Sequence, residues 1–592
     1  MASAGPPTSP EGPRADRLTL EAVAIIALAA VALFVMADAI ETVRSLHTVL
    51  PYWNGWAPVI EWDELKSGSF TAADWFGQHN EHRPAFARLF YFLDIAAFGG
   101  RNIVQGPLAL LLQFSIAGLL ATASLLLFRR RESWPAIVSV CAIAAVALQF
   151  SMAQVENFVL PFNLHWILGY SAAAWSLACA AAVPARAGWR RRALLGAALL
   201  LAVCAQFSVA YAVMVWPAMF GMGLLLRIRK VELAAIAATG LAVTAGYYAT
   251  YDAPSGLGSP SNLVTQPLDT VAFLLSVLGD PFQPVAGTPL ARIAGFFGIL
   301  AAAWLLADMR LRPRAYGAAG AFLVAEMAFV LLATIFITVL HAPDGAAGAE
   351  APHYAVGPAA FWTCLLLLSW HVALRRVRGP VAMRLPQMAA AVLVLIAAAT
   401  PWQSVEPWRE QLTGLRPTAD AMRAGVYDDT ALARIYPAAR VDEIGPLIEI
   451  LKKRHLSVFH GANDSEVIGR PLEDVFFVSP GSCAGFFDSV LDAHSGAGAG
   501  VSGWAWDRVN KQTVAKVVIA GADGTLIGLA TTSTPRPDVV VGAPEVKSAD
   551  SGWFGYSRVS AGEATAYAIL PGGVACPLEG TQVVAPENAT SR

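Results

Sequence analysis

Uncharged apolar stretches of about 20 residues recur along this chain, and they constrain its fold more than any other feature. Residues 105–128, for example, read QGPLALLLQFSIAGLLATASLLLF. A helix of about 20 such residues crosses the hydrocarbon core of a bilayer, which is about 30 Å thick. Because 56% of the 592 residues are apolar and only 14% are charged, the sequence predicts an all-α polytopic membrane protein. The net charge of −2 and the lack of a polybasic tail argue against a nucleic-acid partner.

Eleven membrane spans are expected from the distribution of apolar residues. The first is too long for the core of a signal peptide and has no small-residue cleavage site, so we expect it to be retained. The predicted spans begin near Leu18, Gly106, Trp134, His165, Ala193, Tyr211, Val231, Thr288, Ala315, Gly357 and Leu385.

Basic residues indicate the orientation of these spans, since Lys and Arg collect in cytoplasmic loops. Basic clusters precede the first span and follow each even-numbered one, whereas the loops 153–164, 251–270 and 341–356 contain no Lys or Arg. We therefore expect a cytoplasmic arm over 1–17, a transmembrane domain over 18–400 and an extracytoplasmic C-terminal part. The frequent Ala, Gly and Arg suggest a GC-rich bacterium and hence its inner (plasma) membrane.

The C-terminal part divides into two segments by its pattern. Residues 401–477 are expected to be a linker with a helix in ARVDEIGPLIEILKKRHL, and 478–592 a small β-sandwich, because Ala-Asp-Gly between two β-rich runs is a hairpin signal. Cys483 and Cys576 would lie near the first and last strands, and could form a disulfide if this part faces an oxidising compartment.

The longest early loop, 41–105, carries the polar hexapeptide QHNEHR at 78–83. Pro84 follows, and proline favours the first turn of a helix, so we expect an amphipathic interfacial helix after it. The N-terminus of that helix, with Arg83 and Arg88, is suited to bind phosphate. Glu81 between His79 and His82 adds groups that can accept or orient a proton at neutral pH.

Two simpler interpretations of this hexapeptide stay open at this point. A charged loop outside a membrane is usually just solvated, and an ion pair between Glu81 and Arg83 would contribute little. Zinc could bind His79, His82 and Glu81, but adjacent ligands at this spacing fit no common metal motif. No metal residue is assigned and no cofactor is certain, while a divalent metal is an open alternative.

The order of these parts resembles the GT-C superfamily of polytopic glycosyltransferases, which includes protein mannosyltransferases and aminoarabinose transferases. In those families a polar motif precedes an interfacial helix in the first outside loop, where this chain has HNEHRPAFARLF. It looks most like bacterial members with a Gln-His-Asn-Glu-His-Arg signature and a Glu-Asn pair in the second outside loop, here Glu156 and Asn157. The segment APHYAVGPAAFW resembles their late Arg-Tyr segment, with His353 in place of the arginine.

The resemblance implies transfer of a sugar, with inversion, from a polyprenyl-phosphate donor to an extracytoplasmic glycan or lipid acceptor at the membrane lipids. A carboxylate would take the proton of the acceptor hydroxyl. Glu81 is the first candidate and Asp63 the second; Asp38 is a third, since a charge at membrane depth is often functional, although it could equally cap a helix exit. The expected substrate-binding residues are His79, Asn80, His82, Arg83, Arg88, Glu156, Asn157, Arg292, His353 and Tyr354.

Three tryptophans of the C-terminal part, Trp504, Trp506 and Trp553, could stack on sugar rings, although aromatic residues in β-sandwiches more often belong to the core. A transporter or flippase for a lipid-linked glycan is the main rival function. Such proteins place ionisable residues at the bilayer midplane, where we expect none in this chain. A polymerase or ligase of lipid-linked glycans is the other rival; it would depend on a large late outside loop.

Overall fold

The computed structural model describes residues 12–436, 443–461, 467–491 and 497–585. The chain forms two compact units. The helical unit comprises Met1–Ser45, Ala72–Phe90 and Gln105–Pro407; the barrel unit comprises Leu46–Thr71, Tyr91–Val104 and Trp408–Arg592. The loop 41–105, expected to be one piece of the transmembrane domain, is thus divided between the units, and its polar hexapeptide belongs to the helical unit.

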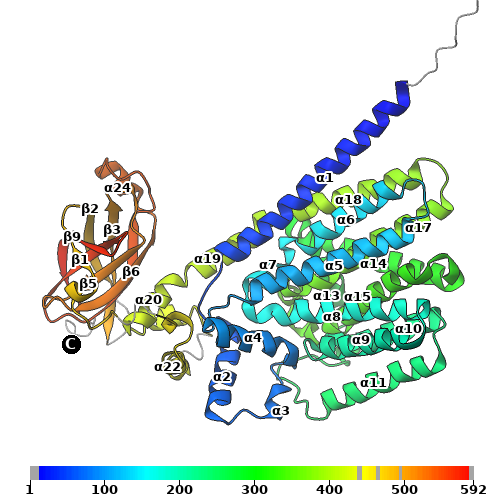
Figure 1. Ribbon diagram of the computed structural model, residues 1–592, viewed down its shortest axis with the longest axis horizontal. Helices are drawn as coiled ribbons and strands as arrows, with labels where there is room; N and C mark the ends of the chain where they lie inside the picture. The colour runs from blue at the N-terminus through cyan, green and yellow to red at the C-terminus, as the bar shows by residue number, and fades with distance from the viewer. Residues whose placement is uncertain (1–11, 437–442, 462–466, 492–496, 586–592) are drawn as a thin grey trace, which may run out of the picture. The chain divides into compact units, whose positions relative to one another are not determined.

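The helical unit is built from long apolar helices that run side by side (Figure 1). Helix α15 (Gly317–His341) lies at its centre. It packs against α5 (Gln105–Phe128), α8 (Leu164–Ala182), α10 (Val215–Leu225) and α17 (Val356–Arg376). Short helices α3 (Ala72–Trp75), α12 (Asn262–Thr265) and α16 (Gly345–Ala349) lie in its loops. The long helices and the short α7 are α1 (Gly12–Ser45), α5 (Gln105–Phe128), α6 (Trp134–Gln149), α7 (Val155–Val159), α8 (Leu164–Ala182), α9 (Gly188–Gln206), α10 (Val215–Leu225), α11 (Lys230–Tyr248), α13 (Pro267–Gly279), α14 (Gln283–Leu311), α15 (Gly317–His341), α17 (Val356–Arg376) and α18 (Val381–Ala399).

Within the described residues, nine helical segments are long and apolar enough to cross a membrane. Eleven were expected from the sequence. The two others correspond to α9, which starts with three arginines at 190–192, and to α10, which has only 11 residues. The outer helices expose large apolar side chains, such as Leu20 and Leu241, as expected when the solvent is lipid. The chain is therefore a multi-pass, mostly α-helical membrane protein.

One expectation about these helices is wrong. The sequence was expected to hold no ionisable residue at mid-depth, but Glu326 lies near the middle of α15 and is only 1% exposed. Its Oε2 atom and the hydroxyl of Tyr170 on α8 are buried without a hydrogen-bond partner among the described residues. A single acidic residue in an apolar run hardly changes mean hydropathy, so the pattern concealed it.

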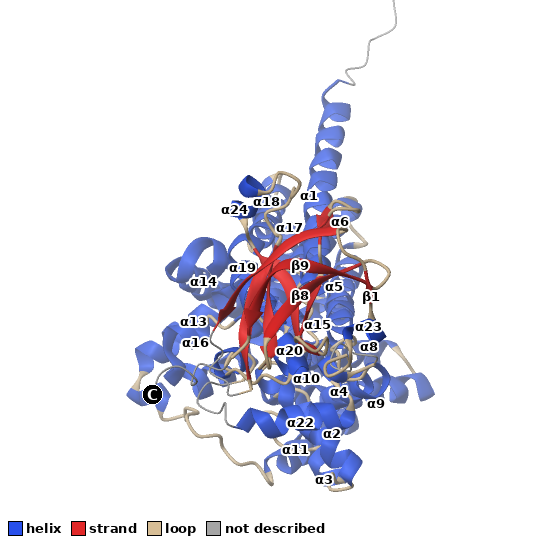
Figure 2. Ribbon diagram, turned by 90° about the vertical axis from the view of Figure 1, so that its left-hand side faces the viewer, coloured by secondary structure: helices blue, strands red, loops and turns tan. Residues whose placement is uncertain are grey.

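The barrel unit contains one β-sheet that closes on itself (Figure 2). Seven strands form the closed order β9-β2-β3-β7-β6-β5-β8, and β8 pairs again with β9. The two-residue strands β1 and β4 lie at its margins. The strands are β1 (Phe477–Val478), β2 (Cys483–Leu491), β3 (Gly498–Asp507), β4 (Gln512–Thr513), β5 (Lys516–Ala520), β6 (Leu526–Thr534), β7 (Gly552–Arg558), β8 (Glu563–Leu570) and β9 (Val574–Val583).

This closure corrects the expected β-sandwich to a barrel. Alternating apolar residues are common to both architectures, and only the long-range pairings of β9 with β2 and β8 separate them. The predicted hairpin is confirmed, since β5 and β6 pair across Ala522-Asp523-Gly524, with Gly524 at φ 78°. A disulfide joins Cys483 on β2 to Cys576 on β9, with Cα atoms 6.1 Å apart.

The barrel unit also contains helices. Asp63 on α2 pairs with Arg454 on α22, with 2.6 Å between Oδ1 and Nε. The backbone N–H of Ser457 donates to the carbonyl of Gly99, so the second half of the early loop also belongs to this unit. The helices are α2 (Ala57–Ser67), α20 (Arg416–Ala424), α21 (Asp429–Leu432), α22 (Ile444–Arg454), α23 (Leu472–Val475) and α24 (Pro537–Gly542), while α4 (Ala85–Phe98) and α19 (Pro401–Thr413) each begin in the helical unit.

Candidate functional site

A two-residue turn positions the carboxylate of Glu81. The backbone N–H of His79 donates to the carbonyl of His82 over 2.8 Å, and that of His82 donates back over 2.9 Å. Asn80 occupies the left-handed region at φ 49°, which asparagine tolerates better than most residues. The hydroxyl of Tyr247 donates to the carbonyl of Glu81 over 3.1 Å. The hexapeptide is thus a fixed turn and not a freely solvated loop.

Two arginines hold this turn in place by binding backbone carbonyls. The Arg83 guanidinium donates to the carbonyls of Phe76, Tyr247 and Thr250 over 2.8–3.0 Å, and to the Thr250 hydroxyl over 3.1 Å. Arg88 donates through Nη1 to the carbonyls of Trp75 and Gly77.

Both arginine side chains are buried, at 6% and 2% exposure for Arg83 and Arg88. Their expected role as phosphate-binding cations stays a prediction, and in this structure their N–H groups donate to backbone carbonyls. Their positive charge is used to organise the loop, because a buried guanidinium requires acceptors for its N–H groups.

The Glu81 carboxylate lies in a buried cluster of hydrogen-bond donors. Its Oε1 atom accepts from the hydroxyl of Tyr211 over 2.8 Å, and it lies 3.4 Å from Nε2 of His82 and 3.3 Å from Nε2 of His341. The neighbouring imidazoles hold the pKa of Glu81 well below its usual range, against the opposing effect of burial. Glu81 is therefore an ionised carboxylate at neutral pH.

The hydrogen bonds also indicate which ring nitrogens carry protons. His82 Nδ1 accepts from the backbone N–H of Ala210 over 3.3 Å, so its Nε2 carries the proton that faces Glu81. Burial lowers the pKa of His82 and keeps this ring neutral. The Tyr211 hydroxyl gives its proton to Glu81 and accepts from Nε2 of His341 over 2.8 Å, while Nδ1 of His341 lies 2.9 Å from Asp344. His341 thus donates through both nitrogens, as an imidazolium does.

A second acidic residue lies in the same aromatic network. Glu156 on α7 accepts from Asn163 and lies 3.1 Å from Nδ1 of His353. The ring of His353 packs against Trp166, and Trp166 packs against His82, Tyr211 and Tyr354. The structure therefore brings together Glu81, His79, His82, Glu156, Asn157, His353 and Tyr354 from the expected set, in one end of the helical unit.

Three buried polar atoms of this network have no hydrogen-bond partner among the described residues: Nε2 of His79, Nε2 of His165 and Oδ1 of Asn157. The rings of His79 and His165 both contact Phe162, and the Asn157 amide donates to the carbonyl of His353. Leaving such an atom unpaired costs about 1–3 kcal/mol. A bound molecule with several hydroxyl groups would satisfy them.

Sequence reasoning missed five members of this cluster: His165, Trp166, Tyr211, His341 and Asp344. They lie at the ends of spans that the positive-inside pattern already assigned to one side of the membrane. Polar residues at the same ends of neighbouring spans tend to converge, and that signal could have identified them.

Three further candidates from the sequence, Asp63, Asp38 and Arg292, lie on other helices. Asp63 belongs to the barrel unit, where it forms its ion pair with Arg454. Asp38 is half-buried on α1 of the helical unit. Arg292 on α14 donates through Nε to the hydroxyl of Ser276 over 2.9 Å.

The three tryptophans expected to stack on sugar rings differ in their burial. Trp553 fills the barrel interior and is fully buried, and Trp506 packs at 3% exposure against Val539 and Val546. Trp504 is half-buried against the same cluster as Trp506. The two buried rings, Trp506 and Trp553, stabilise the barrel, and sugar stacking by the partly exposed Trp504 stays a prediction.

Among the described residues, no group of three or more His, Cys, Asp or Glu side chains is arranged to hold a metal ion. Comparison with family models, with curated proteins and with solved structures returned no match. The function must therefore be argued from the site itself.

Proposed function

We propose that this protein is a membrane glycosyltransferase that moves a sugar from a polyprenyl-phosphate donor to an extracytoplasmic glycan or lipid acceptor. The proposal includes a GT-C-like fold with eleven spans, a cytoplasmic N-terminus and a bacterial inner-membrane location. Glu81 is the base. One observation carries it: an ionised carboxylate is held on a fixed turn, surrounded by imidazoles and by polar atoms that lack partners.

In the proposed reaction, the acceptor hydroxyl loses its proton to Glu81 while its oxygen bonds to the anomeric carbon. The bond from that carbon to the lipid phosphate breaks, and the phosphate leaves with the bonding electrons. Because attack and departure occur on opposite faces, the configuration inverts. The lowered pKa of Glu81 makes it a weak base, so proton transfer is late, after the forming bond has acidified the hydroxyl.

The surrounding side chains have distinct roles in this proposal. Tyr211 and His341 hold the carboxylate in position through hydrogen bonds, and His79 and Asn157 bind sugar hydroxyls through their unpaired atoms. Because Arg83 and Arg88 donate to backbone carbonyls, contact with the donor phosphate is assigned to Arg292, which was expected to bind substrate.

The test measures sugar transfer and lipid-phosphate release by the purified protein with a panel of polyprenyl-phosphate sugars. Glu81→Gln is expected to lower turnover about 100-fold or more, because a positioned base contributes about 10²–10⁴ in rate. Asp63→Asn is the matched control, since it removes a carboxylate charge from the barrel unit. Donor binding and thermal unfolding of both variants separate loss of chemistry from loss of fold.

Two results would refute the proposal in different ways. If Glu81→Gln keeps its activity while Asp63→Asn loses it, the base is assigned wrongly. If the wild-type protein transfers sugar from no donor and binds none, the glycosyltransferase function is wrong.

A transporter of lipid-linked glycans is the second candidate, and buried Glu326 is the observation that favours it. Ionisable residues inside membrane spans often mark transport pathways. Transport of a fluorescent polyprenyl-phosphate sugar across proteoliposomes, lost in Glu326→Gln but kept in Glu81→Gln, would support this alternative.

A further inference from the structure

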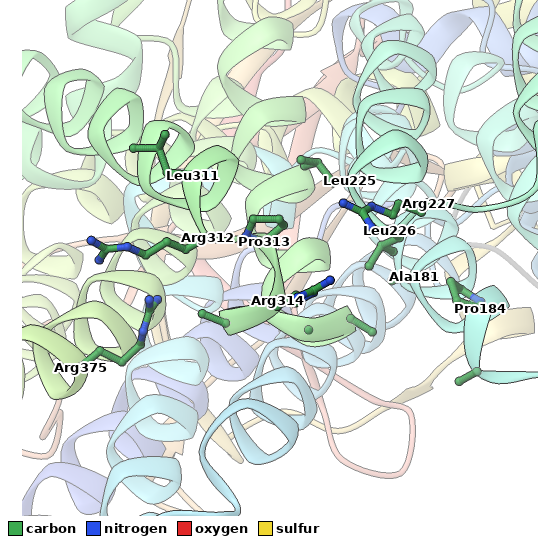
Figure 3. Close-up of a pocket in the computed structure, with 14 residues that line it drawn as sticks. Ala181, Pro184, Leu225, Leu226, Arg227, Leu311, Arg312, Pro313, Arg314 and Arg375 are labelled. Carbon is green, nitrogen blue, oxygen red and sulfur yellow. The ribbon is translucent and has the colours of Figure 1, made fainter.

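The helical unit contains a cavity of about 930 Å³ at the ends of several helices. It lies where α10 and α14 end and where α15 begins, beside the last turn of α17. Figure 3 shows the side chains that line it: Arg312 and Arg375 lie at the left, Arg227 at the right and Arg314 between them. Four arginines, from two loops and one helix end, thus converge on one cavity.

The charge of this cavity is strongly positive, because its lining contains these four arginines and no acidic residue. The carboxylate of Asp308 pairs with two of the lining arginines, but it is buried and is shared by Arg312, Arg375 and Arg376. Within the described part of the chain, neither Arg227 nor Arg314 forms an ion pair. An anion entering the cavity would find unneutralised guanidinium groups.

One atom of Arg375 marks where such an anion would gain a contact. Its Nη1 is buried and has no hydrogen-bond partner among the described residues, although it lies 3.5 Å from Asp308. Basic loops normally follow the positive-inside rule and need no ligand. A half-buried arginine with an unpaired N–H at a cavity wall is not explained by that rule.

The cavity is distinct from the cluster around Glu81, since the two lie at opposite ends of the same helices. Helix α15 begins at the cavity with Gly317 and ends with His341 beside Glu81. Its 25 residues span about 37 Å. The arginine distribution assigns the cavity end to the cytoplasmic side.

We infer that this cavity binds a phosphate group, and that the headgroup of an acidic phospholipid supplies it. Arginine guanidinium groups match phosphate oxygens in geometry and charge. The rim carries Leu225, Leu226 and Leu311, of which Leu311 is 78% exposed, and these apolar side chains suit the glycerol and upper acyl region of a lipid. Basic pockets between helices at this membrane side are typical of such headgroup sites. The inference does not rest on the proposed glycosyltransferase function.

The test uses the full-length protein in detergent, titrated with short-chain phosphatidylglycerol and followed by native mass spectrometry. The double variant Arg227→Gln, Arg314→Gln is expected to bind this lipid about thirtyfold more weakly, from the usual contribution of two basic side chains at an anionic surface. The matched control, Arg129→Gln with Arg130→Gln, removes the same charge from the exposed turn after α5 and is expected to bind as the wild type does.

Two further measurements test the roles of charge and of the lipid. Arg227→Lys with Arg314→Lys should keep most of the binding, because the positive charge remains. Glycerol 3-phosphate, titrated in parallel, identifies the source: if it binds as tightly as the lipid and with the same dependence on the arginines, the lipid assignment is wrong. If the double glutamine variant and its control bind phosphatidylglycerol equally, the phosphate site itself is refuted.

Discussion

The two ends of the helical unit use arginine in opposite ways. Around Glu81, the guanidinium of Arg83 is buried and donates to four backbone or side-chain oxygens. At the cavity end, Arg227 and Arg314 are exposed and form no ion pair within the described residues. The same side chain therefore fixes a loop where its N–H groups are satisfied internally, and can bind an external anion where they are not.

Burial thus decides which basic residues of a membrane protein are available to a ligand. A buried guanidinium must be satisfied by the protein when it folds, because an unpaired charge in a low-dielectric interior is very costly. An exposed one is satisfied by water and can exchange water for a phosphate. Counting arginines near a motif, without their burial, overestimates its capacity to bind anions.

The largest expected effect on stability follows from removing the buried arginine. Arg83→Met removes the donor from the carbonyls of Phe76, Tyr247 and Thr250, of which only Tyr247 is a buried residue, and should destabilise the protein by about 3 kcal/mol or more. Arg314→Met removes an exposed charge and should change stability by about 0.5 kcal/mol or less. Thermal unfolding in detergent, followed by tryptophan fluorescence, compares them. Similar melting temperatures for the two variants would contradict the distinction.

The second effect concerns the hydroxyl that binds Glu81. Tyr211→Phe removes a hydrogen bond to a buried carboxylate and should cost about 1.5–3 kcal/mol. The matched control is Tyr170→Phe, because the buried Tyr170 hydroxyl has no hydrogen-bond partner among the described residues, so its removal should be neutral or stabilising. The same melting experiment measures both. Equal losses in the two variants would show that the Tyr211 hydrogen bond contributes nothing beyond packing.

Features that depend on neighbouring residues could be predicted from the sequence. Pro84 indicated the start of the helix that begins at Ala85, and Asp523-Gly524 indicated the hairpin between β5 and β6. Apolar runs located the long helices for the same reason, since each run is long enough to form one helix by itself. Local patterns were therefore enough for most helices and strands.

Features that depend on distant residues could not be predicted. Tyr211 and Glu81 are separated by 130 positions in the chain, and Arg83 and its acceptor Thr250 by 167. The end of α11 provides carbonyl groups for Arg83, and the residues near Arg83 in the sequence do not predict where that helix ends. Barrel closure depends likewise on β9 meeting both β2 and β8. In each case the deciding contact is tertiary.

The smallest expected effect concerns protonation at the Glu81 end. Burial, together with the electrostatic influence of His82 and Arg88, lowers the pKa of His79 from 6.5 to about 4. Between these pH values the unfolded chain binds the proton and the folded protein does not, so acid favours unfolding. His79 therefore contributes stability that is complete above about pH 6.5 and is lost progressively as the pH falls toward 4. The lowered pKa of Glu81 adds a similar loss only below its ordinary value of 4.5.

Melting temperatures between pH 4.5 and 7 test this prediction by difference. Over that range, the melting temperature of the wild-type protein should fall a few degrees more than that of His79→Gln, because the glutamine cannot take up a proton. A loss of about 1 kcal/mol lowers the melting temperature by about 2–4 °C in a chain of 150–250 residues, and by less in a longer one. His455→Asn, which replaces an exposed histidine in the barrel unit, is the control and should follow the wild-type curve. If the wild-type and His79→Gln curves are parallel, His79 is not held neutral by its surroundings. The Glu81 end would then be as open to solvent as the arginine end, and the contrast between the two would rest on Arg83 alone.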